Sequence, residues 1–436
     1  MFRKSVLLSL SVLALGLPSQ SETLQDALDL AFETNPALEA QRADLGVARE
    51  QLSQARGAKA PTVELSGSAG YESLDTTQPT AFGLGDRPIS SAQLQASLPL
   101  YAGGRLDAGI GQAQAGVMAA DAQFDGVAQD LVLNVVTAYV DVIRDRETIR
   151  IRANSVALLE EQLRAATDRF EVGFATRTDV KQAEARVQGA RASLAGAEAQ
   201  LQASLAVYEV FVGQPAGDLV PVSDAPIIPE SFEAALETAI SGNPDLEALR
   251  QSERAAEQAL RSAKGEGRPS LSLVGTAAVQ ETFDQEAVDF DPILGQVQLP
   301  PDNYRDTQLR LLAQGSVPLF QGGILRSRVR ATRLQRDQAR LQTLNAERQI
   351  TASVAQSWYS NIAAEQAITA SERQVEAAEI AYEGAQEELS VGTRTTLDVL
   401  DQEQQLLEAR LGLVNAQRDA YVATHQLLRA MGQLSF

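Results

Sequence analysis

The sequence contains no cysteine and a single histidine, His425. Without cysteine, the chain cannot form disulfides, thiolate zinc sites or an acylated N-terminal cysteine, and it has no cysteine nucleophile. One histidine leaves most metal sites and acid–base sites without their usual side chain. His425 has no potential partners nearby in the sequence, which predicts an ordinary surface residue. These shortages argue against an enzyme and predict a chain with no cofactor and no metal.

Basic residues are also in short supply. The chain has 37 Lys and Arg against 57 Asp and Glu, a formal net charge of −20. Nucleic-acid binding needs a basic surface that displaces counterions from phosphates, so this class of function is excluded. Aromatic residues make up only 5% of the chain, whereas apolar residues reach an ordinary 44%. Burial must therefore come mainly from Ala, Leu and Val, the residues of long helices.

The first 21 residues have the layout of a secretory signal peptide. Arg3 and Lys4 form a short basic start, and an apolar run covers residues 6–17. This run is too short for a transmembrane helix and predicts cleavage near residues 19–21. The alternative is a disordered or amphipathic N-terminus. No later apolar run looks long enough to cross a bilayer as a helix, so we expect an exported protein without one.

The chain carries an internal duplication. Residues 35–38 (NPAL) recur at 243–246 (NPDL), and residues 98–104 (LPLYAGG) recur as VPLFQGG at 317–323. We therefore predict a first repeat over residues 22–213 and a second over 230–433. The segment between them, 214–229, contains four prolines and is expected to be an extended linker.

Each repeat contains two segments in which apolar or small residues alternate with polar residues. The expected strands are 62–72 and 91–101 in the first repeat, and about 270–281 and 307–319 in the second. Strands of about 9–11 residues with two different faces are typical of membrane barrels. Tyr101 and Phe320 are expected at the end of the second strand of each pair, where a barrel carries interfacial aromatics. Two amphipathic hairpins packed on a soluble core are the alternative.

Long helical hairpins are expected over residues 104–212 and 323–431. Their first arms contain about 68 residues, or roughly 100 Å of helix at 1.5 Å per residue. Helices of this length must pack as coiled coils or as a helical barrel. The hairpin turns contain Val172-Gly173 and Val391-Gly392, with glycine where a helix end favours a left-handed residue. After these turns, Thr176 with Asp179, and Thr395 with Asp398, have capping-box spacing and restart the helix.

Four strands cannot close a barrel, and an open sheet edge in lipid leaves backbone groups without hydrogen bonds. If the strands enter a membrane, several subunits must share the barrel. Two chains would supply eight strands and three would supply twelve. Helices of roughly 100 Å would then continue the conduit well beyond a bilayer about 30 Å thick.

At this point the chain resembles the TolC-type outer membrane efflux and secretion channels, also called outer membrane factors. The resemblance covers about residues 23–433 and rests on the duplicated NPxL, the two PL(Y/F)xGG junctions, and residues 391–401, VGTRTTLDVLD. It implies a mainly α protein with a membrane β-barrel. Three protomers, each with four strands, would complete a 12-stranded barrel that continues into a periplasmic helical barrel.

The resemblance also implies a function and partners. The trimer would be the passive exit duct of a tripartite efflux or type I secretion system. It would sit in outer membrane lipid and extend into the periplasm, joined there by a periplasmic adaptor and an inner-membrane pump of the RND or ABC class. Drugs, metals and secreted proteins all stay open as cargo. The alternative, an exported soluble coiled-coil scaffold, has no need of the four alternating strands.

The family closes its periplasmic end with acidic residues and an arginine at the hairpin turns. Carried onto this sequence, the gate positions are Arg394, Asp398 and Asp401 in the second turn, with Thr178 and Asp179 in the first. Three copies of Asp398 and Asp401 around an axis would form two rings of carboxylates, and crowding would raise some of their pKa values. The alternative is that Asp398 only caps its helix. The family archetype has a tyrosine where this chain has Leu389, which leaves the latch itself open.

The two turns also match the tips on which the family's adaptor docks. The residues concerned are Val172, Gly173, Thr176, Val391, Gly392 and Thr395. Turn chemistry alone also accounts for glycine and threonine at these positions.

Overall fold

A computed structural model of the chain describes residues 22–72, 87–222, 225–283 and 304–434. The predicted signal peptide lies outside these residues. The described chain divides into two compact units. Unit 1 comprises residues up to 43, 122–247 and from 345 onward, and unit 2 comprises residues 44–121 and 248–344. Each unit takes segments from both sequence repeats, so the compact units do not coincide with the repeats.

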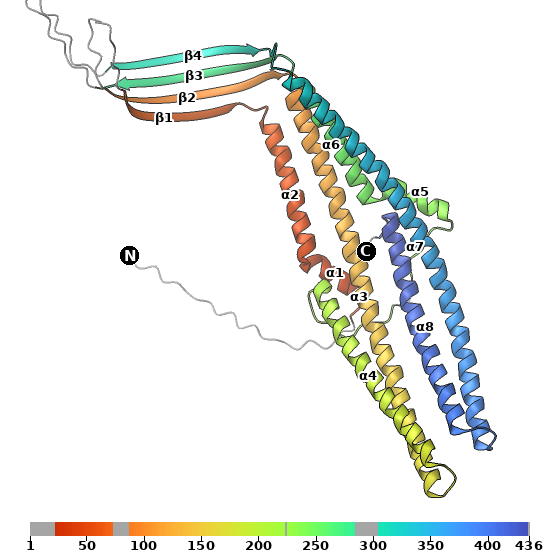
Figure 1. Cartoon of the computed structure of the whole chain (residues 1–436). Coiled ribbons are helices and arrows are strands. Elements are labelled where there is room, and N and C mark those ends of the chain that lie inside the picture. The colour runs from red at the N-terminus through yellow and green to blue at the C-terminus, as the bar shows by residue number, and fades with distance from the viewer. Residues whose placement is uncertain (1–21, 73–86, 223–224, 284–303, 435–436) are drawn as a thin grey trace, which may run out of the picture. The chain divides into compact units, whose positions relative to one another are not determined.

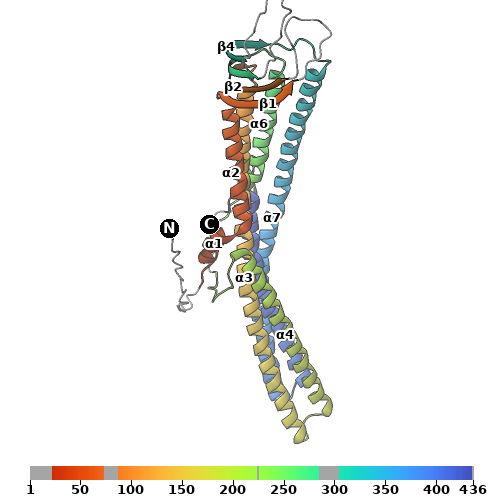
Figure 2. The ribbon, with the colours of Figure 1, turned by 90° about the vertical axis from the view of Figure 1, so that its left-hand side faces the viewer.

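The two halves of the chain are built from the same succession of elements (Figures 1 and 2). The first half consists of α1 Leu24–Thr34, α2 Pro36–Gly57, β1 Thr62–Glu72, β2 Arg87–Ala102, α3 Arg105–Glu171 and α4 Arg177–Val212. The second half consists of α5 Phe232–Gly242, α6 Pro244–Gly265, β3 Ser270–Thr282, β4 Tyr304–Ser316, α7 Ile324–Ser390 and α8 Thr396–Met431. Corresponding helices have equal lengths: 11, 22, 67 and 36 residues in each half.

The strands of unit 2 form one antiparallel sheet in the order β1-β2-β3-β4 (Figure 1). Strand β4 begins and ends earlier than the expected 307–319, so Phe320 does not end a strand as Tyr101 does in β2. Pro318 provides the reason, because proline has no N–H for the ladder and restricts the residue before it. The expectation that Phe320 closes its strand was therefore wrong.

The junction between β2 and α3 requires glycine. Gly103 has φ +64°, and a Cβ at this position would lie 2.4 Å from the carbonyl oxygen of Gly265 at the end of α6. The corresponding Gly322, between β4 and α7, also has positive φ but nothing within 4 Å of a Cβ among the described residues. The double glycine in the first repeat thus allows two backbones to approach, whereas in the second it provides only a turn.

In unit 1, α3 with α4 and α7 with α8 form two antiparallel helical hairpins (Figures 1 and 2). The largest core cluster brings α1, α3, α4 and α8 together around Val135, Tyr139 and Tyr208, each with an exposed fraction of 0%. The Tyr139 hydroxyl lies 2.7 Å from the carbonyl oxygen of Val220 in the linker. A second cluster packs α5 against α7 and α8 through Val354 and Leu427.

His425 is buried, and the expectation of a surface residue was wrong. Only 5% of it is exposed, its ring lies 4.5 Å from that of Tyr421, and its Nδ1 lies 2.7 Å from the Tyr421 carbonyl oxygen. Burial lowers the pKa of the histidine. The residue belongs to the core-facing side of α8, where Leu427 and Leu428 are also buried.

One described helix, α3, contains a stretch long and apolar enough to cross a membrane by length and composition. By this criterion, the expectation that no later apolar run is long enough to cross a bilayer was wrong. Half of that stretch is buried inside the protein. Core helices pass the same test of length and composition, and a half-buried stretch is consistent with a helix that packs in the protein core.

Candidate channel gate

The first hairpin turn connects α3 to α4. Gly173 adopts φ +85°, and Thr176 then caps α4. The Thr176 backbone N–H and hydroxyl donate to Asp179 Oδ2 at 2.8 and 2.9 Å, and Thr176 Oγ1 accepts from the Asp179 N–H at 3.3 Å. These hydrogen bonds hold the pKa of Asp179 below its ordinary value. Thr178 is exposed in the first turn of the same helix.

The second hairpin turn, between α7 and α8, repeats this arrangement. Gly392 adopts φ +81°, and the Thr395 hydroxyl and N–H donate to Asp398 Oδ2 at 2.7 and 2.9 Å. Both hydrogen bonds, with a smaller contribution from Arg394, lower the pKa of Asp398. Both capping boxes predicted from the sequence are therefore present. A raised pKa in a ring of three acids concerns the assembled protein and stays a prediction.

Arg394 pairs within its own hairpin. Its Nε lies 2.5 Å from Glu388 Oε2 in the last turn of α7. In the single chain this ion pair braces the α7–α8 turn. A tie from Arg394 to a helix outside its own hairpin stays a prediction about the assembled protein.

Asp401 connects the two hairpins. Its Oδ1 accepts a hydrogen bond of 2.7 Å from Arg186 Nη2 on α4. Asp398 and Asp401, which were predicted to form neighbouring rings in a trimer, thus have different partners in the single chain. Asp398 pairs with the cap residue Thr395, whereas Asp401 pairs with Arg186 of the other hairpin. Arg186 was not among the residues selected from the sequence, because nothing local distinguishes it from the other exposed arginines.

Two residues after Asp401 on α8, Glu403 is buried between helices. Its Oε1 accepts a 3.0 Å hydrogen bond from Ser155 Oγ on α3, and only 5% of the residue is exposed. Burial raises its pKa to about 6. Sequence reasoning missed this residue. The available signal was an acid on the apolar row of α8 that contains Leu400, Leu406 and Ala409.

The tips of both hairpins expose apolar side chains. The exposed fractions of Val172, Phe174 and Val391 are 68%, 86% and 74%. Thr176 and Thr395 are exposed beside them, and Leu389 is half-buried at the end of α7. Large apolar side chains at the end of a helical hairpin gain nothing from the chain's own core, so they are available to other molecules.

The described residues contain no cluster of three or more His, Asp or Glu that could hold a metal ion. The hairpin tips consist instead of capped turns, ion pairs and exposed apolar residues.

Comparison with known proteins gives the same family throughout. Residues 27–210 and 235–433 match the family described as outer membrane efflux protein. The outer membrane efflux protein BepC of Brucella suis is 30% identical, with 99% of this chain and 90% of BepC covered. The outer membrane protein TolC of Vibrio cholerae is 29% identical, with 95% and 92% covered. The alkaline protease secretion protein AprF of Pseudomonas aeruginosa is 25% identical, with 93% and 83% covered.

Among solved structures, the outer membrane protein VceC of Vibrio cholerae superposes with a TM-score of 0.78 at 21% identity, covering 94% of this chain and 96% of VceC. This likeness establishes the fold. The TolC-type resemblance is confirmed, and the channel is favoured over a soluble scaffold. The chain therefore belongs to the outer membrane efflux protein family, whose members are channels of the outer membrane that extend into the periplasm and are not enzymes.

Proposed function

We propose that the chain forms a homotrimer that serves as the passive exit duct of a tripartite efflux or type I secretion system. The observation that carries this proposal is the two-faced sheet of unit 2. Leu65, Leu94, Ala277 and Leu309 are directly opposed across all four strands. The neighbouring row contains Glu64, Gln95, Thr276 and Arg310. Adjacent residues of a strand point to opposite faces, so these rows give the sheet one apolar face and one mainly polar face, on which Val274 and Leu312 are apolar exceptions.

The apolar face suits outer membrane lipid. Leu65, Leu309 and Leu311 have exposed fractions of 74%, 85% and 72%. Membrane barrels alternate apolar residues toward lipid with polar residues toward the lumen. We infer that the row with Glu64 and Arg310 lines the barrel interior.

The two edges of the sheet explain why several copies are needed. Among the described residues β1 pairs only with β2, and β4 only with β3. An unpaired edge in lipid costs several kcal/mol per backbone group. Because the sheet has an even number of antiparallel strands, β4 of one copy can pair antiparallel with β1 of the next. Two copies would give eight strands and three would give twelve, and the family's architecture favours three.

The gate and the docking tips belong to the same proposal. Arg394, Asp398 and Asp401 of the second turn, with Thr178 and Asp179 of the first, would narrow the periplasmic end. The exposed tips around Val172-Gly173-Thr176 and Val391-Gly392-Thr395 would contact the periplasmic adaptor, which links the duct to an RND or ABC pump. The names of the relatives refer both to efflux and to protease secretion. We propose that this duct likewise carries either compounds removed by an efflux pump or a secreted protein.

Light scattering of the protein purified in detergent tests the assembly. We expect a protein mass three times that of one mature chain. A mass of one chain would overturn the shared barrel, and a mass of two would replace twelve strands with eight.

A further inference from the structure

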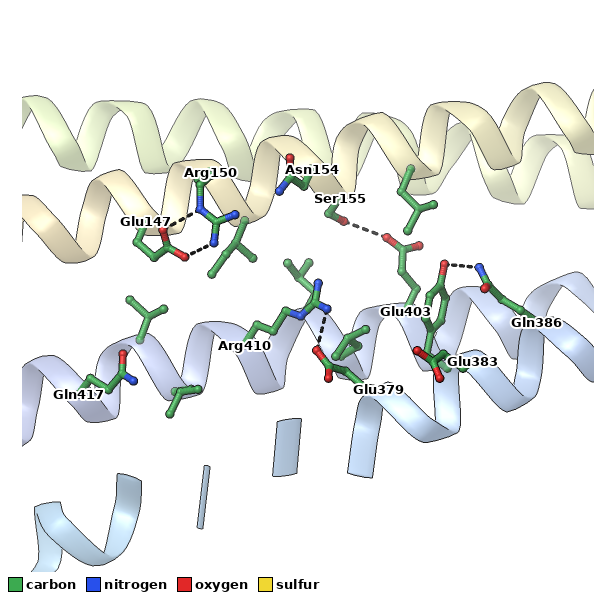
Figure 3. Close-up of a pocket in the computed structure, with 17 residues that line it drawn as sticks. Glu147, Arg150, Asn154, Ser155, Glu379, Glu383, Gln386, Glu403, Arg410 and Gln417 are labelled. Carbon is green, nitrogen blue, oxygen red and sulfur yellow. Dashed lines mark hydrogen bonds and ion pairs between the residues drawn. The ribbon is translucent and has the colours of Figure 1, made fainter. Parts of the chain in front are cut away.

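Unit 1 contains a cavity of about 840 Å³ between α3, α7 and α8 (Figure 3). Small-molecule sites usually have volumes of about 300–1,000 Å³. The cavity is bounded by Glu147 to Leu158 on α3, Glu379 to Gln386 on α7, and Glu403 to Gln417 on α8. It lies wholly within unit 1, away from the residues at the hairpin tips.

Two of its four carboxylates are already paired. Arg150 Nε donates to Glu147 at 2.7 Å, and Arg410 Nη2 donates to Glu379 at 2.8 Å. Figure 3 shows both pairs along the cavity, on α3 and between α7 and α8. Both lining arginines are thus occupied, which leaves no free cation for an anionic ligand among the described lining residues.

Glu403 is only half satisfied. Figure 3 shows its carboxyl group extending from α8 toward Ser155 on α3, and the Ser155 hydroxyl donates to Oε1. Oε2 is buried and has no hydrogen-bond partner within the described chain. A buried charged group with a missing partner destabilises the fold unless another molecule supplies the missing donor. The burial that leaves Oε2 unpaired also raises the pKa of Glu403 to about 6, so the group is ionised at pH 8.

Around Glu403 the cavity provides surfaces for an aliphatic stem. Ile151 and Leu158 line it from α3, and Leu406 and Leu407 line it from α8. Tyr382, which is on α7, also lines the cavity near Glu403, and its hydroxyl accepts a hydrogen bond from Gln386. The wall also contains polar side chains, among them Asn154, Gln386 and Gln417. Apolar side chains beside the Glu403 carboxylate complement a ligand that combines a hydrocarbon chain with one cationic end.

We propose that this cavity binds organic cations that carry a primary ammonium group on an aliphatic stem, with the carboxylate of Glu403 as the anionic partner. The described residues offer no cluster of ligands for a metal ion, which leaves an organic cation as the chemistry that fits. All the residues that line the cavity belong to one chain, and none of them is among the proposed gate residues.

The test uses the full-length mature protein in detergent at pH 8 and titrates dansylcadaverine, a fluorescent primary amine on a five-carbon stem. N-pentyl dansylamide, which lacks the terminal ammonium, measures partition into micelles. We expect saturable binding of the amine only, with displacement by spermidine. Glu403→Gln keeps the shape but removes the charge, and should weaken binding at least about tenfold, since hydrogen bonds to charged groups contribute about 1.5–3 kcal/mol.

Glu376→Gln is the matched control. It makes the same change on α7, but Glu376 does not line the cavity and is largely exposed beside Arg373. Its affinity for dansylcadaverine should equal that of the unmodified protein. Equal affinities for Glu403→Gln and the unmodified protein, or an equal loss in Glu376→Gln, would overturn the proposal.

Acidity provides a second readout. Several charged and titratable groups line the same cavities as Glu403: Glu147, Arg150 and Arg152 on α3, Arg186 on α4, Glu379, Tyr382 and Glu383 on α7, and Glu408 and Arg410 on α8. Burial raises the pKa of Glu403 to about 6, which lies between pH 5 and pH 8. Affinity for dansylcadaverine should therefore fall between pH 8 and pH 5 in the unmodified protein and stay constant in Glu403→Gln. A pH profile shared by both proteins would contradict a role for Glu403.

Discussion

Glu403 occupies a position on α8 where its neighbours on the same face are apolar. Val399, Leu400, Leu406 and Ala409 are buried on this helix. An uncharged residue there would avoid the cost of burying a carboxylate with one oxygen unpaired. Residues that a fold retains against its own stability are frequently functional, and this is why the cavity beside Glu403 is a better candidate for a ligand site than the ion pairs around it.

The raised pKa of Glu403 makes a stability prediction with a definite sign. The folded protein binds this proton up to about pH 6, whereas the ordinary value of 4.5 applies to the unfolded chain. The stability that the protonated group contributes is therefore fully present below pH 4.5 and is lost as the pH rises through 6. The shift corresponds to about 2 kcal/mol.

Glutamine imitates the protonated carboxyl at every pH. Glu403→Gln should therefore raise the thermal unfolding midpoint at pH 8 and leave it unchanged at pH 4, as measured by circular dichroism in detergent. A lower midpoint at pH 8 would contradict the prediction. The expected gain in stability also means that loss of amine binding in this variant cannot be attributed to unfolding.

At the scale of elements, the strand-to-helix junctions allow a matched comparison. Gly103 and Gly322 occupy equivalent positions in the two repeats and both have positive φ, but only a Cβ at Gly103 meets backbone atoms of another helix. Gly322→Ala should cost about 1–2 kcal/mol, the strain of a left-handed alanine. Gly103→Ala should cost more, because α6 must also move.

The yield of protein folded into membranes and its thermal midpoint would measure the effect of both substitutions. We expect a larger loss in Gly103→Ala on both scales. Equal losses in the two variants would mean that the close approach of Gly103 and Gly265 adds nothing to the stability cost of Gly103→Ala.

The capping boxes make a prediction about the hairpin tips. Removing an N-cap side chain usually costs about 1 kcal/mol. Thr395→Ala should therefore speed hydrogen exchange of the first amides of α8 by about fivefold, because the Asp398 N–H loses the acceptor that it has at 3.3 Å. The first turn of α4, capped by Thr176, is the internal control. Unchanged exchange in α8 would show that packing, and not the cap, holds this turn.

At the scale of the whole molecule, the gate makes the clearest prediction. Arg394→Ala removes the ion pair with Glu388 that braces the second turn. If this arginine holds the duct shut, the variant should have a higher resting conductance in planar bilayers than the unmodified protein. Arg177→Ala, which removes an exposed arginine from the other tip, is the control and should leave conductance unchanged. Equal conductance of Arg394→Ala and the unmodified protein would reject the gate.

Local patterns made many of the elements predictable. Alternation indicated the strands because each has one apolar and one polar face, and the VG turns with their Thr-x-x-Asp spacing indicated where the long helices stop and restart. The helices α1, α2, α5 and α6 were not assigned. They are short, with 11 or 22 residues, and each pair lies between the start of a repeat and its first strand. The end of β4 was misjudged because alternation continues past Ser316, although Pro318 cannot extend a ladder.

The sequence by itself determined the duplicated plan, the two-faced strands, the capped turns and the family. These features depend on contacts between residues near in the chain, or on a motif that can be read directly. Only the tertiary structure decided the pairing of Asp401 with Arg186, the burial of His425 and the half-satisfied carboxyl of Glu403. These depend on which faces of helices from distant parts of the chain meet, and a pair such as Glu403 with Ser155 is fixed by packing, which leaves no local signature.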